Sequence, residues 1–140
     1  MADQPAPFDI MPTFRYRDVE AAIRWLVDVL GCTEQAVMRV EGGVAHGELG
    51  YGTGMMMVAS FPDQIGATGK VPELDLGHSA TYLIDDSDDV VEQTWQRALA
   101  AGAPVVDAFH HAPYGGTSFT VRDPEGNYWT VGSYRPTPRA

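Results

Sequence analysis

The order of secondary-structure signals, a strand, a helix and then three strands, occurs twice along this chain and restricts its fold more than any other feature. The first helix is predicted from Asp18, which can cap its start, to Gly31, which can end it, because the apolar residues between them recur at helical spacing. The second carries Trp95 on its apolar face and ends at Gly102, while the acidic run 85–89 leaves several caps open. Eight β-prone runs surround the helices, at 12–16, 34–40, 44–49, 55–60, 79–84, 105–110, 117–122 and 127–133. The chain is therefore predicted to be an α+β protein of two βαβββ modules, each a curved mixed sheet with one helix.

The two modules also match in sequence. Residues 42–60 laid on 115–133 without a gap pair two successive glycines with two glycines, and Ser60 with Ser133. The identity is low, but the shared element order supports an internal repeat. The expected organisation is one compact domain with a loose tail (1–9), a first module (10–60), a proline-containing linker (61–76), a second module (77–134) and a second tail (135–140).

Composition excludes several classes of partner. The chain has 19 acidic residues against 9 Lys and Arg, a formal charge of -10, whereas nucleic acid or an anionic membrane surface would require a basic stripe. No apolar run approaches the ~20 residues that cross a bilayer. The single cysteine, Cys32, cannot form an internal disulfide, and no basic and apolar leader opens the sequence, so a cytoplasmic setting is expected.

The turn before the last strand carries a family resemblance. Together with RDVEAA at 17–22 and ALAAGA at 98–103, the DPEGN turn at 123–127 resembles the glyoxalase, bleomycin-resistance and extradiol-dioxygenase superfamily, which has the vicinal oxygen chelate fold. The resemblance covers residues 10–134 and is strongest to bleomycin-resistance-like and uncharacterised glyoxalase-like members. It implies two βαβββ modules with an open face that holds a ligand, and a homodimer, since members of the family often pair two chains.

For the metal-using branches, the resemblance also implies four ligands, His or Glu, on the first and last strands of each module. Carried over to this sequence, the four positions hold Met11, Met57, either His78 or Tyr82, and Thr130. The third position depends on whether Asp85 or Asp89 is the counterpart of Asp18. Thioethers and a threonine suit neither Ni, Zn nor Mg, and a catalytic site usually takes three protein ligands, so no metal and no other cofactor is expected.

Alternation of side chains assigns the strand residues to two faces. The parity expected beneath the helices is shared by Phe14, Tyr16, Met56, Val58, Thr81, Leu83, Trp129 and Val131. From the opposite parity and the loop after 112, the predicted ligand-binding residues are Arg15, Met55, Met57, His78, Tyr82, Tyr114, Tyr128 and Thr130. This mixture of soft apolar and hydrogen-bonding groups suits a bulky organic ligand.

Catalytic chemistry has weaker support. His46 and Glu48 lie two residues apart on one strand, face the same way and could act as a base and its orienting partner, and His78 is a third candidate. In the ungapped match the counterparts of His46 and Glu48 are Phe119 and Val121. This weakens a location in the ligand groove and favours a solvated surface pair.

The function that the sequence favours is metal-independent binding of a small organic molecule, in the manner of bleomycin-resistance proteins that sequester an antibiotic. The alternative is a lyase, an isomerase or a metal-dependent enzyme of the same superfamily with displaced ligands. The expected partners are the small ligand and a second copy of the chain, with neither nucleic acid nor membrane.

Overall fold

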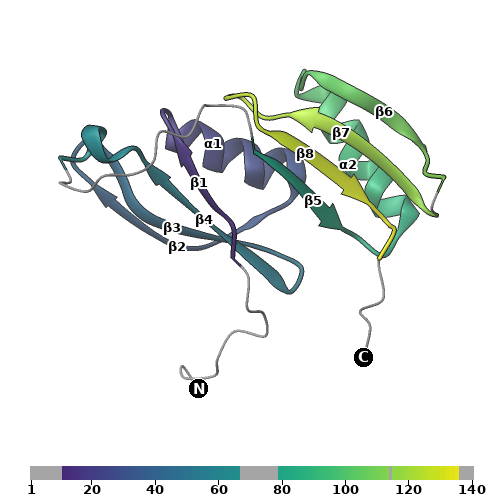
Figure 1. Ribbon diagram of the computed structural model, residues 1–140, viewed down its shortest axis with the longest axis horizontal. Coiled ribbons are helices and arrows are strands. Elements are labelled where there is room, and N and C mark those ends of the chain that lie inside the picture. Colours follow the sequence, from purple (N-terminus) through teal and green to yellow (C-terminus); the bar gives the residue numbers. More distant parts are fainter. Residues whose placement is uncertain (1–10, 67–78, 114, 136–140) are drawn as a thin grey trace.

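Two four-stranded sheets lie side by side in the computed structural model, which describes residues 11–66, 79–113 and 115–135 (Figure 1). The strands are β1 (Thr13–Tyr16), β2 (Thr33–Val40), β3 (Gly43–Tyr51), β4 (Gly54–Ser60), β5 (Ala80–Ile84), β6 (Val105–His111), β7 (Thr117–Arg122) and β8 (Tyr128–Gly132). The strand orders are β1-β4-β3-β2 and β5-β8-β7-β6. The pairs β1–β4 and β5–β8 are parallel and the others antiparallel, which confirms the predicted α+β class with two βαβββ modules.

The first helix, α1 (Val19–Trp25), lies against its own sheet and continues as a π-helical segment, η1 (Leu26–Leu30). The Asp18 carboxylate caps its start by accepting a hydrogen bond from the backbone of Ala21 at 3.1 Å. Gly31 ends it with a φ of 85°, the left-handed conformation that favours glycine. Both predicted boundaries therefore hold, whereas the π-helical segment was not predicted.

The second helix, α2 (Asp88–Ala100), packs on β7 and β8 and also on η1. Its cap is Ser87, whose hydroxyl accepts a hydrogen bond from the backbone of Val90. Ser87 is thus the counterpart of Asp18, and the two sequence-based alternatives, Asp85 and Asp89, are wrong. Ser87 was not singled out from the sequence because the aspartates on both sides of it are equally good capping residues.

One apolar core runs through both halves on the helix-facing side of the sheets. The strand side chains of the predicted core parity are buried, apart from the half-buried Thr81. Phe14 from β1 meets Trp129 from β8 with ring centroids 5.1 Å apart. Each fully buried side chain of this size contributes roughly 1.5–3 kcal/mol relative to exposure, so the two halves stabilise each other.

A buried carboxylate strengthens this junction. Asp123, at 3% exposure, accepts hydrogen bonds from the Tyr16 hydroxyl at 2.6 Å, the Trp129 indole at 3.0 Å and the Asn127 amide at 3.0 Å. Tyr16 belongs to the first half and the other donors to the second. Burial and the adjacent carboxylate together hold the pKa of Tyr16 well above its ordinary value, so its hydroxyl stays a donor.

The internal repeat is visible in side-chain contacts at the start of β3 and β7. The Ser60 hydroxyl accepts from the backbone N–H of Val44, and the Ser133 hydroxyl accepts from that of Thr117, each at 2.9 Å. A Cβ atom on Gly43 would overlap the Ser60 hydroxyl, and one on Gly116 would overlap the Ser133 hydroxyl. The glycines and serines that the ungapped match aligned therefore perform the same local task.

The same match fails in the middle of the hairpins. Residue Ala45 is an unpaired bulge in β3, because Met38 pairs with His46 and Arg39 with Val44. Counted between the equivalent pairs Gly50–Met55 and Arg122–Tyr128, the second hairpin encloses five residues against four in the first, and this extra residue restores the alignment at the end. The counterparts of His46 and Glu48 are therefore Ser118 and Thr120, not the buried Phe119 and Val121.

The first part of the predicted linker packs on the first half. A short 3-10 helix, η2 (Pro62–Gln64), follows β4, and the Gln64 amide donates to the backbone carbonyl of Arg17 at 2.8 Å. The Arg17 guanidinium lies 4.0 Å above the centre of the Phe61 ring. Within the described ranges, no helix is long and apolar enough to span a bilayer.

Candidate functional site

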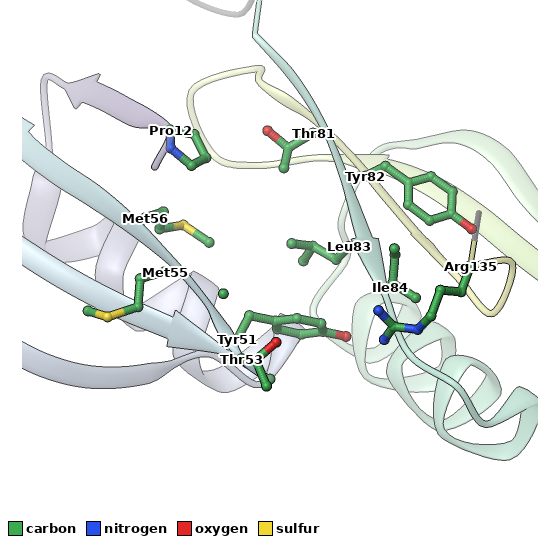
Figure 2. Close-up of a pocket in the computed structure, with 12 residues that line it drawn as sticks. Pro12, Tyr51, Thr53, Met55, Met56, Thr81, Tyr82, Leu83, Ile84 and Arg135 are labelled. Atoms are coloured by element: carbon green, nitrogen blue, oxygen red, sulfur yellow. The ribbon is translucent and has the colours of Figure 1, made fainter. Parts of the chain in front are cut away.

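A cleft of ≈ 270 Å³ opens between the β3–β4 turn and β5, where the two halves meet (Figure 2). The turn side is formed by Tyr51 to Met56, and the β5 side by Thr81 to Ile84. Apolar groups such as Met55, Leu83 and Ile84 dominate the wall, and the Arg135 guanidinium stands at one end (Figure 2). A largely apolar cleft with a few polar groups is the usual form of a site for a small organic molecule.

A second cavity of ≈ 380 Å³ adjoins this cleft and shares Tyr51, Ile84 and Arg135 with it. Its remaining wall is more polar, with Asp85 and Arg97 among the lining residues. The Arg135 guanidinium is paired with Asp86 at 2.8 Å. Together the two cavities offer a more apolar and a more charged compartment that share one tyrosine.

Tyr51 lines both compartments, and it was not among the residues predicted from the sequence. Figure 2 shows its ring across the floor of the cleft with the hydroxyl directed toward Ile84 and Arg135. Burial, helped by the charge of Asp85, raises the pKa of Tyr51 to about 12, so at neutral pH the phenol is uncharged and can donate a hydrogen bond. An aromatic residue inside the glycine-rich turn 50–54 was the signal that could have identified it.

Only part of the predicted ligand-binding set meets at the cleft. Met55 and Tyr82 line it, and the Tyr82 hydroxyl donates to the backbone carbonyl of Tyr134 at 3.1 Å. Arg15 is half-buried, with Nη1 donating to the carbonyl of Ser60 at 2.9 Å. His78 and Tyr114 lie outside the described residues.

The other members of the set lie on the open faces away from the cleft. Thr130 shares a hydrogen bond of 2.7 Å with Thr120, and the Tyr128 hydroxyl accepts one from Arg122, whose guanidinium lies 4.6 Å from the ring centre. Met57 is half-buried and pairs in register with Glu48. The open face of the second sheet is thus rich in hydroxyl groups.

The open face of the first sheet carries the imidazole–carboxylate pair. His46 Nε2 lies 2.6 Å from Glu48 Oε2, with the two side chains 42% and 35% exposed. An unbroken alternation from Val44 would have placed His46 and Glu48 on the helix-facing side, so the bulge at Ala45 puts the pair on the open face. The ungapped sequence match disfavoured this location because it paired His46 with Phe119. It was wrong by one residue, since it took no account of the bulge at Ala45.

The structure also tests the metal positions that the resemblance implied. Opposite Met57 on β1 stands Thr13, and opposite Thr130 on β5 stands Tyr82. Counting seven residues before the Ser87 cap, as Met11 precedes Asp18, gives Ala80 instead. None of these alternatives forms a nitrogen- and carboxylate-rich set, so the residues present do not fit a divalent metal of this family.

Among residues 11–66, 79–113 and 115–135, no group of three His, Cys, Asp or Glu side chains is placed so that it could hold a metal ion. Cys32 is buried, and burial raises the pKa of its thiol to about 12, which leaves almost no nucleophilic thiolate at neutral pH.

The sequence belongs to the Glyoxalase/Bleomycin resistance protein/Dioxygenase superfamily, whose family model matches residues 10–131. Members of this superfamily bind small molecules, and the cleft described above lies where the two modules meet. No match was found among curated proteins.

Three solved structures illustrate the range of similar proteins. TioX from Micromonospora sp. ML1 is 28% identical with a TM-score of 0.64, covering 89% of this chain and 98% of TioX. Lactoylglutathione lyase from Agrobacterium tumefaciens is 23% identical with a TM-score of 0.67, covering 92% and 95%. A glyoxalase/bleomycin resistance protein/dioxygenase from Nocardioides is 14% identical with a TM-score of 0.62, covering 99% and 93%. The last two similarities show the fold alone.

Proposed function

We propose that this protein binds a small organic molecule in the cleft between Tyr51 and β5, without using a metal ion. The observation that carries this proposal is the apolar cleft of ≈ 270 Å³ at the junction of two modules whose family binds small molecules. The metal positions support it, because Met57 and Thr130 stand where His or Glu would be required.

A steric test can separate this cleft from the rest of the surface. Gly54 lines the cleft, and a Cβ atom there would meet nothing closer than 3.5 Å, so Gly54→Leu should fill the cleft without disturbing the core. Saturable binding of an apolar fluorescent naphthalene probe should weaken about tenfold or more in this variant. Leu99→Ala, which removes a 45% exposed leucine from α2, is the control and should bind normally. Equal binding by Gly54→Leu and the wild-type chain would overturn the proposal.

We further propose that the natural role is sequestration of an antibiotic-like molecule. The resemblance to bleomycin-resistance proteins motivates this role, and the acidic charge of -10 is compatible with a cationic antibiotic. Isothermal titration against a panel of peptide and glycopeptide antibiotics should give saturable heat for at least one compound. An absence of heat at high concentration, in a protein that still binds the naphthalene probe, would exclude this role alone. The homodimer remains a prediction that light scattering at several concentrations can check.

A further inference from the structure

The imidazole–carboxylate pair on the first sheet lies outside the two cavities, yet it shares their strands. β3 leads from His46 and Glu48 to Tyr51 at the edge of the cleft, and Met55 of the cleft is two residues from Met57, the neighbour of Glu48. Two residues of a strand span about 7 Å, so a ligand of ~10 Å could occupy the cleft and reach Glu48. The pair is therefore within reach of one bound molecule.

The hydrogen bond between His46 and Glu48 determines which of their atoms remain available to a ligand. An ionised carboxylate only accepts hydrogen bonds, so His46 Nε2 donates to Glu48 Oε2 across the 2.6 Å contact. In the neutral imidazole, Nδ1 is then an acceptor, and Glu48 Oε1 is a second one. Neither atom has another hydrogen-bond partner among the described residues, so the pair presents two adjacent acceptors to the open face.

The surroundings of the pair are apolar and soft. Met57 of β4 pairs with Glu48, and Met38 of β2 pairs with His46. Polarisable thioethers pack against flat aromatic groups and adapt to their shape. On the adjacent strand β2, Arg39 is paired with Glu20 of α1 at 2.8 Å, on the helix-facing side of the sheet. On the open face, Arg15 of β1 is held by Ser60, two strands or ~10 Å from β3 and at about one Debye length.

Stability does not explain the pair. Even with both groups charged, an exposed pair of this kind would contribute only about 0–1 kcal/mol, whereas placing His46 on this face requires an unpaired residue in β3. Bulges that redirect a side chain are frequent beside functional sites. The second sheet has the same topology and, at the equivalent positions, carries Ser118 and Thr120 without such a charge.

We propose that His46 and Glu48 form the recognition site for a protonated amine carried on a flat apolar body, with the body lying on Met57 and in the cleft. This inference rests on the proposed binding function and names the chemistry of the ligand. A charged N–H donor gains a charge-assisted hydrogen bond from Glu48 that a neutral or anionic analogue cannot match.

Three probes with one ring system test this inference: 2-naphthylmethylammonium, 2-naphthalenemethanol and 2-naphthylacetate, each titrated by calorimetry. The wild-type chain should bind the ammonium probe about tenfold more tightly than the alcohol, and the carboxylate least. Glu48→Gln should abolish the preference for the ammonium while leaving the affinity for the alcohol within about twofold. His46→Gln should weaken the ammonium about threefold, because it removes one acceptor.

Glu41→Gln is the matched control, since Glu41 is an exposed acid in the β2–β3 turn and the substitution changes the net charge equally. It should leave all three affinities unchanged. Equal losses for Glu41→Gln and Glu48→Gln would overturn the inference, because they would indicate general charge attraction. Binding of the alcohol without any preference for the ammonium would overturn the inference and leave the proposed function intact. Failure of all three probes to bind would overturn both.

Discussion

The two sheets of this protein share a strand order but differ in the chemistry of their open faces. In the first sheet, Glu48 lies beside Met57 and is paired with His46. In the second, Thr120 lies beside Thr130 and is hydrogen-bonded to it. The helix-facing sides differ far less, since Val58 corresponds to Val131 and both are fully buried. Packing against a helix constrains one face in both halves, while the other face is free to carry different chemistry.

The largest effect is expected from removing a helix-facing side chain. Trp129→Ala should lower the free energy of unfolding by about 3–5 kcal/mol, because it empties a fully buried position and removes one donor to Asp123. Met56→Ala, at the equivalent position of the first half, should cost about 2–3 kcal/mol, since it removes fewer atoms and no hydrogen bond. Urea unfolding measures both. A smaller loss for Trp129→Ala than for Met56→Ala would contradict this ranking.

The connection between the halves predicts the next effect. Tyr16→Phe removes one hydrogen bond to the buried Asp123 carboxylate and should cost about 1.5–3 kcal/mol in urea unfolding. Tyr128→Phe is a control of the same chemistry at a half-buried site, and a cost below ~1 kcal/mol is expected. Similar costs for the two variants would show that the Asp123 network does not hold the halves together.

Alkaline pH should lower stability through the end of β3 and not through the equivalent place after β7, because only the first carries a tyrosine. Tyr51 ends β3, and Asp123 occupies the equivalent place after β7. The folded chain keeps the Tyr51 proton up to a pKa of about 12, whereas an unperturbed tyrosine has 10.0, so the contribution of Tyr51 to stability is complete below pH 10 and falls as the pH rises toward 12.

Urea midpoints at several alkaline pH values can check this, because Tyr51→Phe should lose less stability than the wild-type chain over that range. Tyr16 also has a raised pKa, but its contribution is common to both chains and cancels in the difference. Parallel curves for the two chains would contradict the assignment to Tyr51.

The smallest effect on stability is expected on the open faces. Glu48→Gln should change the free energy of unfolding by less than about 1 kcal/mol, because an exposed imidazole–carboxylate pair contributes little. The expectation for Thr120→Val is similar, since both are on open faces. A loss above ~2 kcal/mol for Glu48→Gln would give the pair a structural role, and the open face would then contribute to folding as well as to ligand chemistry.

Much of the fold could be predicted from the sequence because the signals were local. The Asp18 cap, the Gly31 terminator and the alternation around Val58 and Trp129 each depend on neighbours a few residues away. The cap of α2 was missed because five polar residues in a row all suit a helix start, and only the packed helix selects Ser87.

The candidate site was less predictable, since it depends on contacts between distant segments. Tyr51 becomes half-buried only when β5 and Asp85 of the second half are placed beside it. The location of His46 depends on a one-residue bulge at Ala45, which alternation rules assume to be absent. A slip of this size moves a side chain to the opposite face of a sheet.

The compensating irregularities of the two hairpins have a practical consequence. The bulge adds one residue to β3, the longer turn adds one between β7 and β8, and segments 44–57 and 117–130 therefore have equal length between matching anchor points. Each segment begins at a residue whose backbone N–H donates to a serine hydroxyl, Ser60 in the first half and Ser133 in the second. Each ends in a strand that pairs in parallel with the first strand of its own module. A chimera with one face chemistry on both sheets would therefore keep the length of the chain, although replacing segment 117–130 would also remove Asp123 and its hydrogen bond from Tyr16.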